Sequence, residues 1–191
     1  MSKPRIYLAS KSPRRKMLLG QLRIRFQTIV PDVNEEINEK NPDRFAIKLA
    51  QEKVRSVQTR IKQGVIIGVD TIVVIDNEIL GKPGSKKEAY QIIERLSGRT
   101  HQVISGLYIL SIPSRKYFKT IEKTIVRFYR LSRQDIINYI NSDEPYDKAG
   151  GYGIQSKAGR FIESINGCYY NVVGLPITRL LTGLKKFAVI I

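Results

Sequence analysis

The sequence contains one cysteine, Cys168, and one histidine, His101, in 191 residues. A single thiol cannot close an intramolecular disulfide, and these two residues cannot supply a zinc-binding set of Cys and His ligands. The chain is therefore neither a disulfide-stabilised scaffold nor a zinc module, and a reducing compartment suits it. Its 42% hydrophobic content allows a sizeable buried interior, in one domain or in two small lobes that share a core.

Long apolar runs are missing as well. The first charged residues are followed by a short apolar stretch and then by more charge, which does not make the hydrophobic region of a signal peptide. No stretch reaches the roughly 18 uninterrupted apolar residues that a membrane-spanning helix requires. These absences predict a cytoplasmic protein that does not insert into a membrane.

Acidic residues are scarce: 17 Asp and Glu stand against 33 Lys and Arg, which gives a formal net charge of +16. Such an excess favours polyanionic partners, namely nucleic acid, an anionic membrane or nucleotides. The basic residues are spread along the whole chain, and no RNA-recognition, OB-fold or helix-turn-helix pattern accompanies them. We therefore expect no specific nucleic acid and no membrane as partner. The charge and the ten tyrosines keep a basic nucleic-acid-binding protein as the alternative to an enzyme.

Capping residues predict where the helices begin. Ser12, Asn41 and Ser132 each place a side-chain oxygen at a helix N-terminus, and the first two are followed by proline, which suits the first helical position. Ser85 and Glu88 have the spacing of a capping box. A final helix is expected at about 176–185.

Strands alternate with these helices, which is typical of an α/β protein. Hairpins at Asp76-Asn77 and around Pro113-Ser114 predict a mixed rather than an all-parallel sheet. The stretch 143–159 contains four glycines and is expected to be a long loop, a kind of segment that is often functional. The strands are expected at 5–10, 25–30, 65–76, about 101–112, about 117–131 and near 160–166.

Three cations occupy the first turn of the helix that Ser12 opens, in the run SPRRK at 12–16. This placement is locally unfavourable, because the N-terminal end of a helix dipole is already positive. It becomes favourable if an anion binds there, since free N–H groups and arginines together make a phosphate site. A solvated basic turn is the alternative interpretation.

Lys53 is predicted to face the interior, because it shares a helical face with Leu49, Ala50 and Val57. A buried lysine needs a partner. Either its stem reaches the edge of the core, or its ammonium group meets an anion in a cleft.

Asp70 interrupts the run VIIGVDTIVVID at 65–76, whose β-branched residues predict a central strand buried on both faces. An unpaired carboxylate there would be costly, so a metal ion or a lysine must compensate it. Lys82 is a candidate, because the chain doubles back after the turn at Asp76-Asn77. Glu35, in DVNE after the second strand, adds a carboxylate at a strand end. A structural ion pair is the alternative to a catalytic site.

No nucleophile emerges from the sequence. Cys168 has no nearby histidine, Ser10 and Ser12 lie in no hydrolase motif, and a Walker-type loop ending in Gly-Lys-Ser/Thr is missing. The remaining residues can support attack by activated water on a metal-bound polyphosphate, with a carboxylate as base.

Seven blocks in order along nearly the whole chain resemble the motifs of the Maf family, which is associated with nucleoside triphosphate pyrophosphatase activity. They are LASKSPRRKMLL at 8–19, DVNE at 32–35, GVDTIVV at 68–74, ILGKP at 79–83, LSGRTHQV at 96–103, DKAGGYGIQ at 147–155 and INGCYYNVVGLP at 165–176.

The resemblance implies a single Maf-like domain over 1–191, with an elongated mixed sheet, flanking helices and two lobes around a central cleft. It also implies a divalent cation, Mg²⁺ or Mn²⁺. Carried over by motif, Asp70 is the proton acceptor and, with Glu35, a metal ligand. Lys53 and Lys82 bind phosphates. The further substrate-binding and specificity positions are Arg14, Arg15, Ser10, Thr71 and Gln155.

Two positions depart from the family pattern: Ser156 follows the glutamine of GIQ, where glycine is common, and Val69 replaces the commoner alanine. Neither change removes a charged residue that the resemblance places in the site. The double arginine at Arg14-Arg15 resembles the dTTP/UTP branch rather than the members that prefer methylated guanine nucleotides. A house-cleaning pyrophosphatase for modified purine nucleotides and a regulator of cell division remain as alternatives, and a homodimer is a possible assembly.

Overall fold

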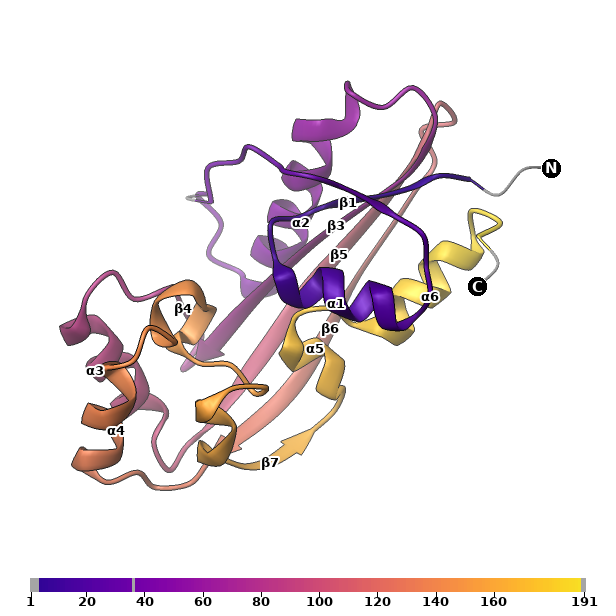
Figure 1. Ribbon diagram of the computed structural model, residues 1–191. Coiled ribbons are helices and arrows are strands. Elements are labelled where there is room, and N and C mark those ends of the chain that lie inside the picture. The colour runs from indigo at the N-terminus through magenta and orange to yellow at the C-terminus, as the bar shows by residue number, and fades with distance from the viewer. Residues whose placement is uncertain (1–3, 36, 190–191) are drawn as a thin grey trace. The chain divides into compact units, whose positions relative to one another are not determined.

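The structure is a computed structural model that describes residues 4–35 and 37–189. Strands and helices alternate along these residues, as the sequence predicts (Figure 1). The strands are β1 (Ile6–Ala9), β2 (Gln27–Ile29), β3 (Gly64–Ile75), β4 (Glu78–Leu80), β5 (Thr100–Ile112), β6 (Tyr117–Phe128) and β7 (Ile162–Asn166). The α-helices are α1 (Pro13–Gln21), α2 (Pro42–Gln58), α3 (Lys86–Leu96), α4 (Arg133–Ile140), α5 (Tyr169–Val173) and α6 (Ile177–Lys185).

The strands of the described residues form one mixed sheet in the order β2-β1-β3-β5-β6-β7, with β4 paired to β3. β1 runs parallel to both β2 and β3, whereas the pairs β3–β4 and β6–β7 are antiparallel. β3 lies inside the sheet, and every residue of it except Thr71 is buried. The predicted mixed sheet and the central strand buried on both faces are therefore confirmed.

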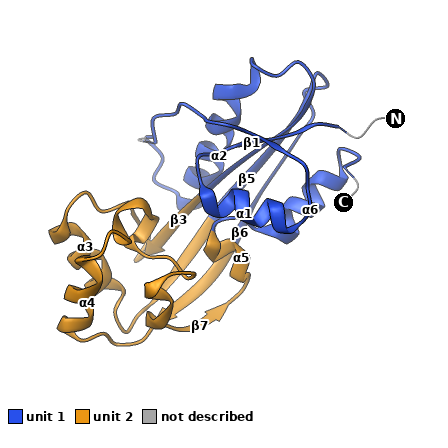
Figure 2. Cartoon of the chain, in the orientation of Figure 1, with its two compact units in different colours: residues 1–70, 105–122, 174–191 blue, residues 71–104, 123–173 orange. Residues whose placement is uncertain are grey.

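The contacts of the chain divide it into two compact units (Figure 2). Unit 1 consists of residues 1–70, 105–122 and 174–191, and unit 2 consists of residues 71–104 and 123–173. Strands β3, β5 and β6 contribute residues to both units. Asp70 is the last residue of a segment of unit 1, and Thr71 begins unit 2.

Helices α1 and α2 of unit 1 begin where their capping residues predict. The side chain of Ser12 accepts a hydrogen bond from the Arg15 amide, and the side chain of Asn41 accepts one from the Arg44 amide. The apolar face of α2 then packs on β1, β3 and β5 to form a core. Its buried residues are Tyr7, Ala9, Ala50, Val54, Val57, Ile61, Ile66, Tyr108 and Leu110.

Unit 2 has a separate core between its strands and helices α3 and α4. Ser132 and Asp135 form a complete capping box at the start of α4. The predicted box at α3 is only half present, because Glu88 accepts from the Gly84 amide rather than from that of Ser85. The core consists of Val73, Ile75, Leu80, Ala89, Ile93, Leu96, Val103, Val126, Phe128, Ile136, Tyr139, Ile140, Tyr152, Ala158 and Phe161.

The segment 143–159 is more ordered than the predicted loop. It contains the short 3₁₀ helices Pro145–Asp147 and Ala149–Gly151 and the beginning of a third, Lys157–Phe161. Two hydrogen bonds hold it: the Tyr139 hydroxyl donates to the Gly151 carbonyl at 3.0 Å, and the Gly150 amide donates to the Gly81 carbonyl at 2.9 Å. The segment is thus packed onto the rest of unit 2.

The predicted strand at 117–131 is shorter than expected. β6 ends at Phe128, and beyond it the Leu131 amide donates to the Ser97 side chain at 2.7 Å. Across residues 4–35 and 37–189, every helix is too short or too polar to span a bilayer.

Candidate active site

The first part of the site is the turn that joins β1 to α1. Ser10 follows the buried strand β1 and is itself buried, and its hydroxyl accepts a hydrogen bond from the Ser12 amide at 3.2 Å. Ser12 then caps α1. This pair of serines turns the chain tightly, so that Arg14 and Arg15 lie in the first turn of the helix. The cationic helix start inferred from the sequence is therefore present.

Arg15 is held inside this turn rather than extended into solvent. Its Nε donates to the Gly174 carbonyl at 2.9 Å, and its terminal nitrogen donates to the Ser10 hydroxyl at 3.3 Å. Burial of the guanidinium lowers the pKa of Arg15 below its ordinary value. The negative charge of Asp70 acts in the opposite direction, as does the smaller effect of Glu35, whereas the positive charge of Arg14 lowers the pKa further. Arg15 thus lies within the electrostatic reach of both predicted acidic site residues.

Lys53 connects the two acids. Its ammonium nitrogen lies 2.5 Å from Asp70 Oδ1 and 2.9 Å from Glu35 Oε1. Lys53 and Asp70 are 7% and 6% exposed, whereas the Glu35 side chain is 49% exposed. Of the two interpretations open from the sequence, the structure supports the one in which the Lys53 ammonium meets an anion.

Gly68 explains why Lys53 reaches Asp70. A β-carbon at Gly68 would lie 2.2 Å from the Ala50 carbonyl oxygen and 2.6 Å from a methyl group of Val54. The absence of a side chain at this point of β3 lets α2 pack directly on the strand. Lys53 follows Ala50 by one helical turn, and Asp70 follows Gly68 by two residues on the strand, so the same close crossing brings the two charges together.

Within unit 1, Lys53 is a lysine that compensates Asp70. That Lys82 also compensates Asp70 stays a prediction. Lys82 lies in unit 2, after the hairpin in which β4 returns along β3, with Val73 opposite Leu80. The hairpin is the predicted one, and both residues of its turn, Asp76 and Asn77, have positive φ.

The other predicted site residues also belong to unit 2. Thr71 lies on β3, and Gln155 is exposed in a turn closed by a hydrogen bond from the Ser156 amide to the Gly153 carbonyl at 3.2 Å. The Gly150–Gly81 hydrogen bond joins the segment before Gln155 to the segment that carries Lys82. Unit 1 thus holds Ser10, Arg14, Arg15, Glu35, Lys53 and Asp70, and unit 2 holds Thr71, Lys82 and Gln155.

Sequence reasoning missed the Gly174 carbonyl as the anchor of Arg15, and it missed the shared contact of Lys53 with two carboxylates. The glycine two residues before Asp70 was the available signal for the second, because glycine within a strand often marks a close backbone approach. The remote contact from Gly174 to Arg15 has no local pattern that could have revealed it.

Within residues 4–35 and 37–189 no cluster of three or more His, Cys, Asp or Glu residues could hold a metal ion. The donor set at the site is the carboxylate pair Glu35 and Asp70, whose oxygens both contact one cationic nitrogen. Such a pair suits Mg²⁺, which is usually bound through one or two carboxylates plus substrate phosphates rather than by a complete protein cage.

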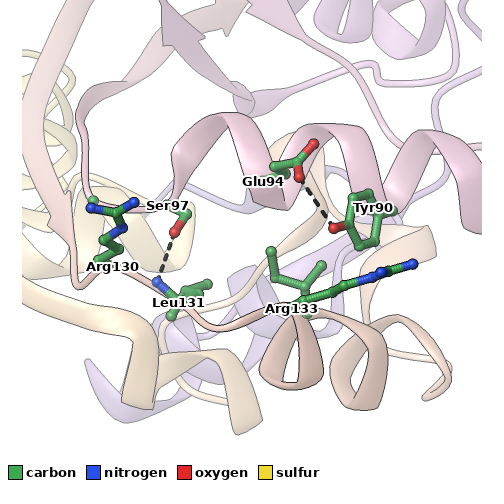
Figure 3. A pocket seen from close by; sticks show the side chains of 8 residues that line it. Tyr90, Glu94, Ser97, Arg130, Leu131 and Arg133 are labelled. Atoms are coloured by element: carbon green, nitrogen blue, oxygen red, sulfur yellow. Dashed lines mark hydrogen bonds between the residues drawn. The ribbon is translucent and has the colours of Figure 1, made fainter.

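A separate pocket of about 420 Å³ lies in unit 2 between α3 and the segment that leads into α4 (Figure 3). Tyr90 and Glu94 from α3 form one side of it, and their side chains share a hydrogen bond. None of the predicted site residues lines this pocket. Its lining residues are Tyr90, Glu94, Ser97, Gly98, Arg130, Leu131, Arg133 and Ile136.

A cationic strand-to-helix turn, with two carboxylates and a lysine in the same unit, is an arrangement that suits a phosphate-handling class of proteins. The profile of the family described as Maf-like protein matches residues 5–187, and the chain belongs to the Maf family.

Three bacterial relatives are each named dTTP/UTP pyrophosphatase. The protein of Carboxydothermus hydrogenoformans is 46% identical over 96% of this chain and 98% of its own length. That of Clostridium botulinum strain Okra is 46% identical over 96% of this chain and 97% of its own. That of Ruminiclostridium cellulolyticum is 43% identical over 95% of each.

Proposed function

We propose that this protein hydrolyses nucleoside triphosphates, dTTP and UTP above others, to the nucleoside monophosphate and pyrophosphate. Relatives with the name dTTP/UTP pyrophosphatase align with nearly the whole chain, which supports the activity and the substrate class. Within the molecule, the observation that carries the proposal is the convergence of Glu35 and Asp70 on the Lys53 ammonium. Acidic and basic groups that a pyrophosphatase needs are thereby gathered in one place.

Asp70 acts as the general base in this proposal. Water attacks the α-phosphorus, the bond from that phosphorus to the bridging oxygen breaks, and pyrophosphate leaves with the electron pair. The proton of the attacking water passes to the Asp70 carboxylate. A nucleophilic side chain is not required, in keeping with the sequence, which offers none.

The cations of the site neutralise the triphosphate. Arg14 lies in the first turn of α1, where the N-terminal dipole also favours an anion. Lys53 and Lys82 contribute further positive charge toward the phosphates. Arg15 is tied to Gly174 and Ser10, so it fixes the shape of the turn and adds charge to it.

A divalent cation, Mg²⁺ or Mn²⁺, completes the proposed site, with Glu35 and Asp70 as its protein ligands. When bound, it supplies charge neutralisation at the phosphate oxygens. The paired carboxylates and the polyphosphate substrate together provide the oxygen ligands that these ions prefer.

Base selection is assigned to Gln155, with Arg14 and Thr71 as further specificity positions. A glutamine amide offers both donor and acceptor groups, which complements the imide edge shared by thymine and uracil. Gln155 is exposed within the turn that the Ser156–Gly153 hydrogen bond closes, so its amide is accessible to a ligand.

The test is an assay of products from dTTP, UTP, CTP, GTP and ATP with Mg²⁺ or Mn²⁺. Chromatography of the nucleotides and separate detection of pyrophosphate and orthophosphate identify the bond that breaks. We expect monophosphate and pyrophosphate in equal amounts, and no turnover after chelation. Formation of the diphosphate with orthophosphate would show cleavage at the wrong bond and refute the proposal.

A further inference from the structure

The ammonium group of Lys53 contacts both carboxylates that the proposed function gives to the metal ion. Its nitrogen lies 2.5 Å from Asp70 Oδ1 and 2.9 Å from Glu35 Oε1. The ammonium donates a hydrogen bond to Asp70 and forms an ion pair with Glu35. The Lys53 side chain is 9% exposed, so little water can reach the ammonium and compete with these two contacts.

A divalent cation that binds the same carboxylates must compete with this amine. Mg²⁺ takes carboxylate oxygens at about 2.0–2.1 Å, and the ammonium already lies within hydrogen-bonding distance of one oxygen of each acid. Two cations on the same oxygens would repel each other strongly in a poorly solvated place. The amine must therefore move when the metal ion binds.

The chemistry of lysine suits such a displacement. Its charge sits at the end of a flexible four-carbon stem with rotatable donors, unlike the rigid planar group of arginine. In the absence of a metal ion, the ammonium relieves the repulsion between Glu35 and Asp70 and compensates the buried charge of Asp70. A bound triphosphate offers it another anionic partner.

We propose that Lys53 is an internal counter-ion that occupies the cation position between Glu35 and Asp70, and that a divalent cation displaces its ammonium from both acids. Lys53 is then a positioning residue: it keeps the two carboxylates close together until the metal ion arrives. The inference rests on the proposed function only in taking Glu35 and Asp70 as the metal ligands.

The first test measures Mn²⁺ binding without any nucleotide, by electron paramagnetic resonance of free Mn²⁺, for wild type and Lys53→Met. Removal of the competing amine should tighten Mn²⁺ binding by about tenfold or more. Glu35→Gln added to Lys53→Met should cancel the gain. Lys48→Met is the matched control, because Lys48 is exposed on the same helix and its loss should leave the affinity unchanged.

The second test uses the wild-type protein, so it does not depend on the folding of a variant. Lysines are acetylated briefly with acetic anhydride, with and without Mg²⁺, and each site is quantified by mass spectrometry. Buried, ion-paired Lys53 should be protected without Mg²⁺ and become severalfold more reactive with it. Lys48 should react equally in both samples.

Several outcomes would overturn the proposal. In the first test, these are an affinity of Lys53→Met for Mn²⁺ that is no tighter than that of wild type, or no Mn²⁺ binding by either protein. In the second test, it is labelling of Lys53 that Mg²⁺ leaves unchanged or reduces. Neither test contains substrate. A chain that passes both but releases no pyrophosphate would refute the proposed function while leaving the role of Lys53 intact.

Discussion

A β-carbon on Gly68 would lie 2.2 Å from the carbonyl oxygen of Ala50, on the helix that crosses it. A β-carbon this close to a backbone oxygen could be accommodated only if the helix or the strand moved. Because Lys53 and Asp70 lie just beyond this crossing on α2 and β3, the spacing of the two elements also sets the geometry of the ion pair.

Gly68→Ala should therefore lower both stability and activity. Overpacking of this kind typically costs about 1–3 kcal/mol, and separation of α2 from β3 should also reduce kcat. Thermal unfolding and a pyrophosphate-release assay measure the two effects. Gly20→Ala is the matched control: Gly20 lies in α1, where an added β-carbon would meet nothing within 4 Å, so this change should be neutral or slightly stabilising. Equal behaviour of the two variants would show that the crossing at Gly68 is not tight.

Asp70→Asn should reduce kcat by about 100-fold or more, the usual range for the loss of a general base. If the buried carboxylate had no partner, its replacement by an amide would raise stability. With Lys53 at 2.5 Å from Asp70, we expect the reverse, a loss of about 3 kcal/mol, because a buried ammonium loses its nearer partner.

A double-mutant cycle of Asp70→Asn with Lys53→Met, measured by urea unfolding and by activity, separates the loss of the ion pair from the loss of the base. The double variant should regain most of the stability that Asp70→Asn loses, while activity stays low. If Asp70→Asn alone retained full activity, Asp70 would be a structural partner of Lys53 and the base would lie elsewhere.

The pH dependence of stability should contain a contribution from His101. The residue is 2% exposed, Nε2 lies 2.6 Å from the Tyr152 hydroxyl, and among the described residues Nδ1 has no hydrogen-bond partner. Burial lowers the pKa of His101 to about 4, from an ordinary value of 6.5. Between these values the unfolded chain binds more protons than the folded one, so stability falls as the pH drops from 6.5 toward 4.

The loss of stability across this window should approach about 3 kcal/mol from His101 alone. Urea unfolding of wild type and His101→Gln at several pH values between 4 and 7 measures it. The variant should be less stable at pH 7 but should have a shallower dependence on pH in this window. An identical slope in both proteins would mean that other groups account for the acid sensitivity.

The local features of the fold could be predicted because their causes are local. Ser12, Asn41 and Ser132 accept hydrogen bonds from backbone amides three residues later, and a short sequence window contains both partners. The β-branched run around Asp70 likewise contains what makes it a central strand. The capping box at Ser85 was only half right, because Glu88 had a second nearby amide, that of Gly84, as a competing donor.

The site itself could be predicted only in part, because its contacts join distant segments. The sequence identifies Asp70 as a carboxylate that needs compensation, but that Lys53 supplies it depends on where α2 crosses β3. The Gly174 carbonyl reaches Arg15 from the opposite end of the chain. Such choices depend on tertiary packing, for which a single sequence gives no direct measure.

Gln155 should control which base is accepted. Its amide can donate to a carbonyl and accept from the N–H of the thymine or uracil imide, whereas cytosine presents an amino group where uracil has a carbonyl. A site built on such hydrogen bonds can reject analogues by several orders of magnitude, since mismatched polar groups are left unpaired. Wild type should therefore prefer dTTP and UTP over CTP and GTP in kcat/KM.

Gln155→Ala should bring the four kcat/KM values closer together, mainly by lowering those for dTTP and UTP, without a change in the bond that is cleaved. Gln134→Ala is the control, because Gln134 is exposed on α4, where its amide donates to Asn138 at 2.8 Å, and its loss should leave all ratios unchanged. Unchanged ratios in Gln155→Ala would mean that this glutamine only orders the turn that its neighbours Gly153 and Ser156 close. A preference of the wild type for purine triphosphates would instead contradict the dTTP/UTP assignment itself, because the amide of Gln155 would then be hydrogen-bonded to the edge of a purine.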